Sequence, residues 1–259
     1  MTETPAFPSP EFHQGRRALV TGAASGIGAA VVEKFSALGA QVLAVDINEE
    51  GLRALADRVP NVIPTPCDLS DLASIATTLP TDVDIVVNNA GIQLVSPIHE
   101  FPLDKFELIM RIMLHAPFYI VRQTLPYMYE RGWGRIVNVS SAHGLRASPF
   151  KSAYVTAKHG LEGLNKVIAL EGGPYGVTST TINPAYVRTP LVEKQIADQA
   201  ATHGIPESEV VEKIMLTGVA VKRLIEPEEV ADLVAFVTGP ASACMTGSSY
   251  AMDAGWTAR

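Results

Sequence analysis

The chain has few cysteines and no pattern of metal-binding residues. Its two cysteines, Cys67 and Cys244, lack metal-ligand spacing, and its six dispersed histidines include no His-Glu-x-x-His motif. We therefore expect two buried free thiols, with no structural disulfide and no bound metal.

Long hydrophobic runs and basic clusters are also missing. The apolar run from Ile136 to Val139 is far too short to span a bilayer, and the N-terminus has no apolar signal core. The formal net charge is −7. These features favour a cytoplasmic protein that binds neither membranes nor nucleic acids.

Strand and helix patterns alternate along the chain, in which 47% of the residues are hydrophobic. Such alternation predicts one α/β domain of Rossmann type, a doubly wound parallel sheet with helices on both faces. We place this domain at residues 15–259, after a flexible leader (1–14) that contains three prolines. The strand patterns lie near 17–21, 41–45, 61–65, 83–88, 134–140, 177–182 and 248–252. The helix patterns lie near 26–38, 49–58, 70–79, 104–131, 153–172 and 227–238.

A glycine-rich segment, Gly22-Ala-Ala-Ser-Gly-Ile-Gly28, follows the first strand. Glycine allows positive φ and close backbone approach, so the amides that start the next helix can bind a pyrophosphate. The spacing Gly-x3-Gly-x-Gly differs from both the usual dinucleotide fingerprint and the P-loop. An ordinary tight strand-to-helix turn is the alternative interpretation.

Asp46 ends the second strand, eighteen residues after Gly28. This is close to the spacing at which a carboxylate meets the adenosine ribose of a dinucleotide. Neither Ser25 nor Ile47 offers a cation for a 2′-phosphate, so we predict NAD rather than NADP. Alternatively, or in addition, Asp46 caps the helix that starts near Asn48.

Three residues beyond the strand near 134–140 form a candidate catalytic group: Ser141, Tyr154 and Lys158. A tyrosine and a lysine four residues apart share a helix face, where the ammonium can lower the pKa of the phenol towards neutrality. A phenolate formed in this way is a proton acceptor. Because a Tyr-x3-Lys pattern arises easily by chance, its place near the strand ends matters more than the spacing alone.

The combined motifs resemble the short-chain dehydrogenase/reductases over residues 15–259. They are Thr21-Gly-x3-Gly-Ile-Gly28, Asn88-Asn-Ala-Gly91, Ser141 and Tyr154-x3-Lys158. Within this family, further segments are similar to bacterial D-3-hydroxybutyrate dehydrogenases: Asn88-Asn-Ala-Gly-Ile-Gln93, Ser141-Ala-His-Gly144, Lys151-Ser-Ala-Tyr154, Ala157-Lys-His-Gly160, Arg188-Thr-Pro-Leu-Val-Glu-Lys-Gln-Ile196 and Gly255-Trp-Thr-Ala-Arg259. The resemblance implies NAD-dependent interconversion of D-3-hydroxybutyrate and acetoacetate.

The resemblance also implies roles for single residues. Tyr154 is the general base, Ser141 holds the substrate oxygen, and Lys158 lowers the Tyr154 pKa and binds the nicotinamide ribose. Asp68 and Leu69 bracket adenine, Asn89 lies along the ribose, and Val187 and Thr189 bind the carboxamide. The full set expected at the cofactor is Gly22, Ser25, Gly26, Ile27, Gly28, Asp46, Asp68, Leu69, Asn89, Gly91, Tyr154, Lys158, Pro184, Val187 and Thr189.

For the substrate carboxylate, the resemblance implies a polar clamp of Gln93, His143, Lys151 and Gln195. Each clamp residue has an alternative: Lys151 can be a solvated loop residue, His143 can fix a turn, and Gln195 can lie on the exposed face of a lid helix. The substrate set also includes Ser141, Tyr154 and Tyr186, the last at a position where related dehydrogenases usually carry tryptophan.

Residues 189–217 form a polar, alanine-rich segment that we predict to be a helical lid. Leu191 and Val192 cover the substrate methyl group or, alternatively, form the packing face of the lid itself.

One position departs from the family: Met113 stands where most members have an asparagine whose main-chain carbonyl holds a relay water. Pro117, four residues later, has no N–H, so the Met113 carbonyl loses its helical donor and can serve the relay in another way. The alternative is that Pro117 merely bends the helix.

The family forms tetramers through this helix and the helix that carries Tyr154, so we expect a homotetramer. Two rival functions remain: a dehydrogenase of the same fold for another hydroxy acid, a polyol or a sugar, and a catalytically weak NAD-binding sensor or interaction protein.

Overall fold

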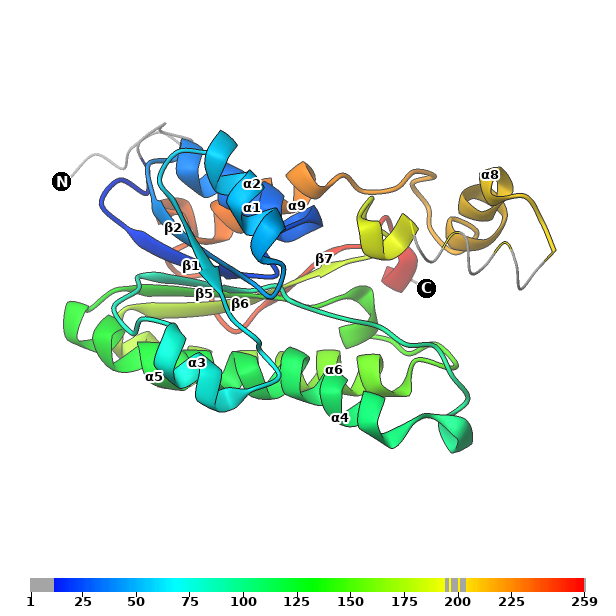
Figure 1. Ribbon diagram of the computed structural model, residues 1–259, viewed down its shortest axis with the longest axis horizontal. Helices are drawn as coiled ribbons and strands as arrows, with labels where there is room; N and C mark the ends of the chain where they lie inside the picture. Colours follow the sequence, from blue (N-terminus) through cyan, green and yellow to red (C-terminus); the bar gives the residue numbers. More distant parts are fainter. Residues whose placement is uncertain (1–11, 194–195, 197–199, 201–203, 259) are drawn as a thin grey trace.

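The computed structural model describes residues 12–193, 196, 200 and 204–258 (Figure 1). In this part of the chain, seven parallel strands form one sheet in the order β3-β2-β1-β4-β5-β6-β7. This confirms the predicted doubly wound α/β fold. The strands are β1 (Arg17–Thr21), β2 (Gln41–Asp46), β3 (Val62–Pro66), β4 (Ile85–Asn88), β5 (Gly134–Val139), β6 (Val177–Pro184) and β7 (Ser249–Met252).

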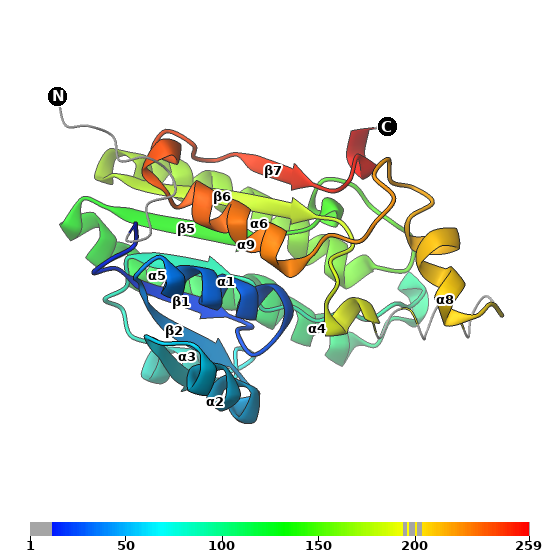
Figure 2. The same ribbon diagram turned by 90° about the horizontal axis from the view of Figure 1, so that it is seen from above.

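Helices cover both faces of the sheet (Figures 1 and 2). One face carries α1 (Gly26–Ala37), α2 (Glu49–Arg58) and α9 (Pro227–Val237). The other carries α3 (Leu72–Thr78), α4 (Leu103–Met110), α5 (Ala116–Arg131) and α6 (Ser152–Gly172). Short 3₁₀ turns are η1 (Ile98–Glu100), η3 (Ala142–Gly144), η4 (Gly173–Tyr175), η6 (Pro240–Ser242) and η7 (Trp256–Ala258).

The strands are apolar along their length because each face of the sheet is buried. In β2, Val42 and Ala44 pack into the cluster under α1, whereas Leu43 and Val45 pack into the cluster on the opposite face. Side chains of a strand alternate between faces, so a sheet covered on both sides requires apolar residues at successive positions. The continuous hydrophobic runs in the sequence have this cause.

The long helix predicted at 104–131 contains a change of helical pitch. Between α4 and α5 lies a π turn, η2 (Arg111–His115), whose following residue Ala116 donates its N–H to Arg111 O. Pro117 stands immediately after this point and has no N–H to continue the normal i to i−4 ladder. Met113 in the π turn is buried, and its Cε would lie 3.5 Å from a Cβ placed on Gly91. The relay water stays a prediction.

Part of the predicted leader belongs to the folded domain. His13 is 1% exposed, its Nε2 lies 3.1 Å from Thr238 Oγ1, and its backbone N–H donates to Leu38 O at 2.8 Å. The sequence boundary at residue 15 therefore falls after residues that pack against α1 and α9. Residues 1–11 lie outside the described part of the chain.

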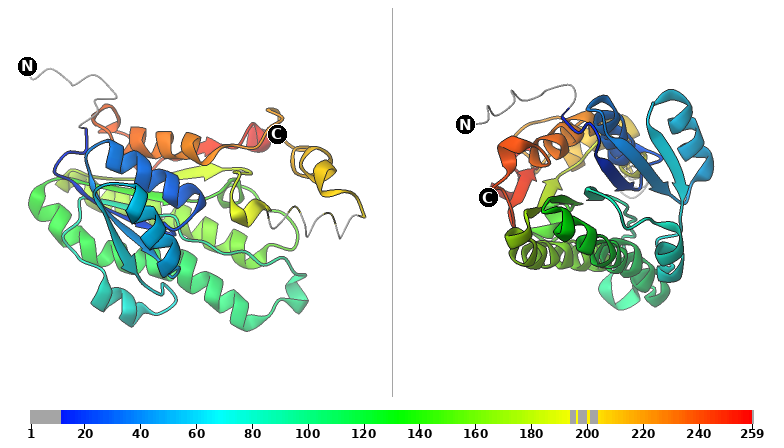
Figure 3. Two further views of the ribbon diagram at one scale, coloured as in Figure 1. Left: turned by 45° about the horizontal axis from the view of Figure 1, so that its top comes forward. Right: turned by 90° about the vertical axis from the view of Figure 1, so that its left-hand side faces the viewer.

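The segment between β6 and α9 extends beyond one edge of the sheet (Figures 1 and 3). It includes a helical turn at residues 190–193, the short helix α8 (Glu207–Val210) and a second π turn, η5 (Val211–Met215). Val192, Val210 and Met215 form a small cluster of their own, on which Tyr186 packs. Among all the described residues, no helix is both long and apolar enough to cross a membrane.

Candidate active site

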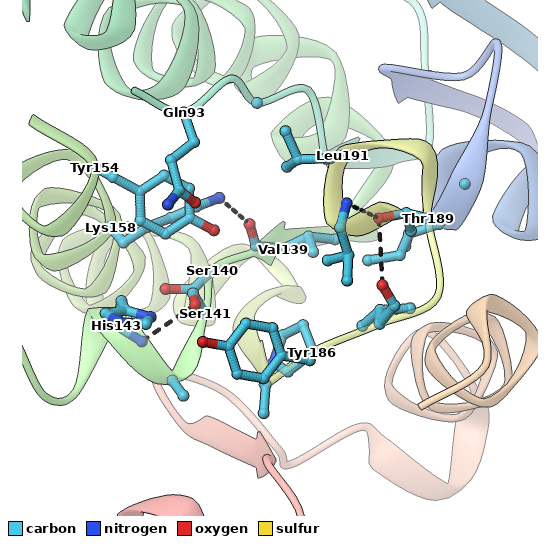
Figure 4. A pocket seen from close by; sticks show the side chains of 18 of the residues that line it. Gln93, Val139, Ser140, Ser141, His143, Tyr154, Lys158, Tyr186, Thr189 and Leu191 are labelled. Atoms are coloured by element: carbon cyan, nitrogen blue, oxygen red, sulfur yellow. Dashed lines mark hydrogen bonds between the residues drawn. The ribbon is translucent and has the colours of Figure 1, made fainter. Parts of the chain in front are cut away.

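A pocket lies at the carboxyl ends of the strands, where the sequence places most of the candidate site residues (Figure 4). The pocket has two ends that differ in their residues. The glycine end is formed by Gly22, Ser25, Gly26, Asp46 and Asn89, and the clamp end by Gln93, His143, Ser148, Lys151 and Trp256. Ser141, Tyr154 and Lys158 also line the pocket.

The glycine end is shaped by positions where side chains do not fit. Gly22 has φ +66°, and a Cβ there would lie 2.8 Å from Ala90 Cα. Gly26 has φ +55°, and its Cβ would lie 2.9 Å from Thr189 Cγ2. Both values of φ lie in the left-handed region that favours glycine. The turn therefore keeps its backbone open towards the pocket.

Gly28 acts one step further from the pocket. A Cβ on Gly28 would lie 2.0 Å from Gly22 O and 2.7 Å from Asn89 Nδ2, so the absence of a side chain allows α1 to start directly above the turn. Ser25, the N-cap of α1, makes no side-chain capping hydrogen bond, and the described first turn of α1 contains no acidic residue. These first amides and the helix dipole can hold an anionic group.

Asn89 ties the glycine turn to the end of β4. Its side-chain Nδ2 donates to Thr21 O at 2.9 Å and to Gly22 O at 3.2 Å. The Thr21 hydroxyl in turn accepts the backbone N–H groups of Asn89 and Ala90. Two loops that meet at the sheet edge are thus locked together by side-chain hydrogen bonds to backbone.

Asp46 lines the pocket at the end of β2. Its Oδ2 accepts the N–H of Ala24 at 3.1 Å, and its Oδ1 accepts the N–H of Asn48 at 3.0 Å. The N-cap of α2 is Asn48 itself, whose side chain accepts the Gly51 N–H. Asp46 therefore is not the cap of α2, and its carboxylate is held at the pocket by two backbone donors.

Ser141, Tyr154 and Lys158 meet between β5 and α6. Ser141 stands two residues after the end of β5, in an extended conformation at the start of η3. Its Oγ accepts the backbone N–H of His143 at 3.1 Å. Tyr154 and Lys158 lie one turn apart on α6, and Lys158 Nζ is 5.6 Å from the centre of the Tyr154 ring. Lys158 is 4% exposed and donates to Val139 O at 2.6 Å (Figure 4).

Burial acts on the pKa of both Tyr154 and Lys158. Burial raises the pKa of the Tyr154 phenol, and a hydrogen bond with Ser141 only partly offsets this effect. The same burial lowers the pKa of Lys158 to about 8, against a raising effect of Glu162. Burial thus opposes the ionised form of both groups, and the lowering of the Tyr154 pKa by Lys158 stays a prediction.

At the clamp end, His143 is held as a neutral hydrogen-bonding group. Its Nε2 lies 3.0 Å from Ser148 Oγ, and its ring lies 5.1 Å from that of Trp256 and 6.1 Å from that of Tyr154. Burial, with further effects of Lys151 and His159, lowers the pKa of His143 to about 4. The imidazole is therefore uncharged near neutral pH.

Gln93 and Lys151 bring donors to the same end. The Gln93 Nε2 group is buried without a hydrogen-bond partner among the described residues. Lys151 is half-buried, its Nζ lies 6.0 Å from the Tyr186 ring centre, and burial lowers its pKa. Because it lines the pocket, Lys151 is not the solvated loop residue that the sequence left open.

Some predicted residues lie elsewhere. Asp68 is exposed and accepts the Ser70 N–H, whereas Leu69 is buried in the core; neither lines the pocket. Gln195 lies outside the described residues. Leu191 and Val192 both line the pocket, and Val192 also belongs to the packing cluster of its own segment.

The pocket also contains residues that the sequence analysis did not select. Ser148 belongs to none of the sequence motifs, and Trp256 was named only as part of the segment 255–259 that is similar to hydroxybutyrate dehydrogenases. The remaining unselected residues are Ala90, Val139, Ser140, Ala142, Ala185, Pro190, Ile214, Met215 and Gly218.

A family model described as short chain dehydrogenase matches residues 16–200. The chain belongs to the short-chain dehydrogenase family. Its glycine turn, Ser141, Tyr154 and Lys158 are thus found on the fold of a family of oxidoreductases that bind a nicotinamide cofactor.

Similar proteins differ in what they act on. A D-beta-hydroxybutyrate dehydrogenase of Rhizobium meliloti is 41% identical over 94% of this chain and 99% of its own length. A D-threitol dehydrogenase of Mycolicibacterium smegmatis is 34% identical over 94% of this chain and 93% of its own length. A variant of actinorhodin polyketide ketoreductase solved with NADPH has a TM-score of 0.85 at 29% identity, covering 93% of this chain and 97% of that one.

Proposed function

We propose that this short-chain dehydrogenase interconverts D-3-hydroxybutyrate and acetoacetate with NAD. The observation that carries the proposal is the set of donors at the clamp end, beside Ser141 and Tyr154. Gln93 offers a buried, unpartnered amide donor and Lys151 a half-buried ammonium. An unpaired buried donor is costly, and a carboxylate is the ligand that satisfies both groups.

In the proposed reaction, the substrate oxygen is held by Ser141 and Tyr154 while the carboxylate reaches towards Lys151. Tyr154 removes the hydroxyl proton during oxidation and returns a proton to the carbonyl oxygen during reduction. A raised Tyr154 pKa favours the protonated phenol, which is the form needed for reduction. Oxidation therefore speeds up as pH rises and Tyr154 ionises.

The residues at the glycine end fit a dinucleotide, which when bound supplies the hydride acceptor and donor. Gly22 and Gly26 would lie along the pyrophosphate, with the first amides of α1 as donors. Asp46 would accept hydrogen bonds from the adenosine ribose. Its neighbours Ser25 and Ile47 carry no positive charge, which supports NAD over NADP.

The helical segment after β6 is proposed to be a lid over the substrate. Leu191 and Val192 near the start of this segment and Ile214 and Met215 near its end line the same pocket. Their apolar side chains suit the methyl end of hydroxybutyrate and exclude water from the reacting groups.

We also propose a homotetramer. Phe118 on α5 and Val167 and Leu170 on α6 are exposed by 52%, 50% and 81%. Both helices lie in the same outer layer (Figure 1). Covering such apolar side chains is favourable in an assembly. Light scattering that gives a monomer contradicts this part of the proposal.

The test is NADH formation, followed by absorbance, after separate addition of D- and L-3-hydroxybutyrate to purified protein with NAD. We expect turnover of the D form and none of the L form. D-threitol serves as the comparison substrate because it has hydroxyls but no carboxylate. Preferential oxidation of D-threitol, or faster reaction with NADP at equal concentration, contradicts the proposal.

A further inference from the structure

Glu162 is a buried carboxylate that lies beside the catalytic group. The proposed reaction does not use it. It lies on α6, one turn after Lys158, and is 6% exposed. Burying a charged carboxylate is costly unless hydrogen bonds compensate for the lost water. The hydrogen-bond donors around Glu162 therefore show what stabilises its buried charge.

Three side chains from two strands donate to Glu162. Asn183 Nδ2 on β6 is 2.6 Å from Oε1, while Thr181 Oγ1 on β6 and Ser249 Oγ on β7 are 2.8 Å and 2.6 Å from Oε2. All three contacts have the carboxylate as acceptor. Glu162 is thus fixed against the end of the sheet rather than facing solvent.

Asn183 connects this carboxylate to the active site. Its Nδ2 donates both to Glu162 Oε1 and, at 3.0 Å, to the backbone carbonyl of Ser141. A carboxylate can only accept, so it requires the nitrogen of the Asn183 amide, and not the oxygen, to face it. In that orientation the second N–H of the amide is directed to Ser141.

We propose that Glu162 is a positioning residue of the active site, which fixes the Ser141 backbone through Asn183 and places a negative charge one helical turn from Lys158. The inference rests on the proposed dehydrogenase function. The electrostatic effect of Glu162 on Lys158, which raises the Lys158 pKa against burial, agrees with the geometry.

The other groups around Glu162 and Lys158 are mostly neutral. On α6 itself Tyr154 lies one turn before Lys158, whereas His159 and Lys166 are exposed, and the clamp end adds His143 and Lys151. Strands β5, β6 and β7 contribute the Val139 carbonyl, Thr181, Asn183 and Ser249, and Ser141 stands at the start of η3. On the side of α6 towards α4 and η2, Ala153 and Ala157 pack against Met113.

Two variants separate hydrogen bonding from charge. Glu162→Gln removes the charge and keeps an oxygen that can accept a hydrogen bond from Asn183. Its NH2 group can donate to Thr181 and Ser249, because their hydroxyls can accept as well as donate. Glu162→Met has similar length but can accept no strong hydrogen bond. Glu171→Gln, on the exposed end of α6, is the matched control.

We expect kcat of Glu162→Met to fall about tenfold or more, and Glu162→Gln to recover most of that loss at its optimum pH. The alkaline limb of kcat in Glu162→Gln should move about half a unit or more to lower pH, since Lys158 releases its proton earlier without the neighbouring charge. Wild-type kcat in Glu162→Met, or a wild-type pH profile in Glu162→Gln, overturns the proposal.

Crystal structures of the variants give a readout that does not depend on the substrate. The Asn183 to Ser141 hydrogen bond should persist in Glu162→Gln and be lost in Glu162→Met; its persistence in Glu162→Met contradicts the positioning role. Should wild-type protein fail to oxidise D-3-hydroxybutyrate, the proposed substrate is wrong. The kinetics are then run on the alcohol that a panel identifies, and the inference about Glu162 is judged on that alcohol.

Discussion

The two ends of the pocket are built in different ways. At the glycine end, the shape depends on backbone: positive-φ glycines, the first turn of α1, and Asn89 bonded to the carbonyls of Thr21 and Gly22. At the clamp end it depends on side chains that reach in from several elements (Figure 4). His143 comes from η3, Lys151 from the start of α6 and Trp256 from η7.

This difference separates what the family shares from what a member selects. A backbone-built end tolerates little change, because a single added Cβ meets backbone atoms. An end built from side chains can change its ligand by substitution without moving the sheet.

The largest effect is expected where the two ends meet, at Tyr154. Tyr154→Phe retains the ring and its packing but removes the group that exchanges the proton. We expect kcat to fall by about 10²- to 10⁴-fold, the usual contribution of general acid–base catalysis. NAD affinity, measured by fluorescence titration, should change far less than kcat, because the ring of Tyr154 and the other cofactor-binding residues remain. Retained turnover shows that another group does the chemistry.

At the glycine end, Gly28→Ala should cost about 3 kcal/mol or more of stability, because the new Cβ would lie 2.0 Å from Gly22 O. Thermal or urea unfolding measures the loss. The control is Gly163→Ala on α6, where a Cβ would have no described heavy atom within 4 Å. That variant should gain about 0.5–1 kcal/mol. Equal stability of the two variants contradicts a close-packed glycine turn.

A smaller change is expected at Asp46. Asp46→Asn removes the charge and keeps an acceptor oxygen for one of the two backbone donors, Ala24 and Asn48, which bind separate oxygens of the Asp46 carboxylate. We expect the ratio of kcat/KM for NADP to that for NAD to rise about tenfold, equivalent to about 1.4 kcal/mol. Initial rates with each cofactor at fixed substrate provide the measurement. An unchanged ratio assigns cofactor choice to other residues.

Local patterns in the sequence predicted much of this architecture. The apolar runs and the glycine turn located six helical regions and seven strands, because strands covered on both faces need apolar residues throughout. The expected gathering of residues at the carboxyl edge follows from parallel topology, so Asp46, Asn89 and Ser141 could be placed there without coordinates.

Other features depend on contacts that no local pattern encodes. His13 is buried by its contact with Thr238, 225 residues away, so the proline-rich start of the chain gave no sign of it. Ser148 lines the pocket beside His143, with which it shares a hydrogen bond. The pKa of Tyr154 depends on the loss of water around its hydroxyl on burial. Spacing alone predicted that Tyr154 and Lys158 share one face of a helix, but it carried no information on the burial that raises the Tyr154 pKa.

The central claim, that the clamp end recognises a small carboxylate, is tested most directly by Lys151→Ala. The measurement is kcat/KM for D-3-hydroxybutyrate beside the Kd for NAD, with the exposed Lys166→Ala on α6 as the control. We predict a loss of about 10- to 100-fold in kcat/KM, the range for removing a charged hydrogen-bond donor, with NAD affinity unchanged and the control like wild type. A Lys151→Ala enzyme with wild-type kcat/KM contradicts the account.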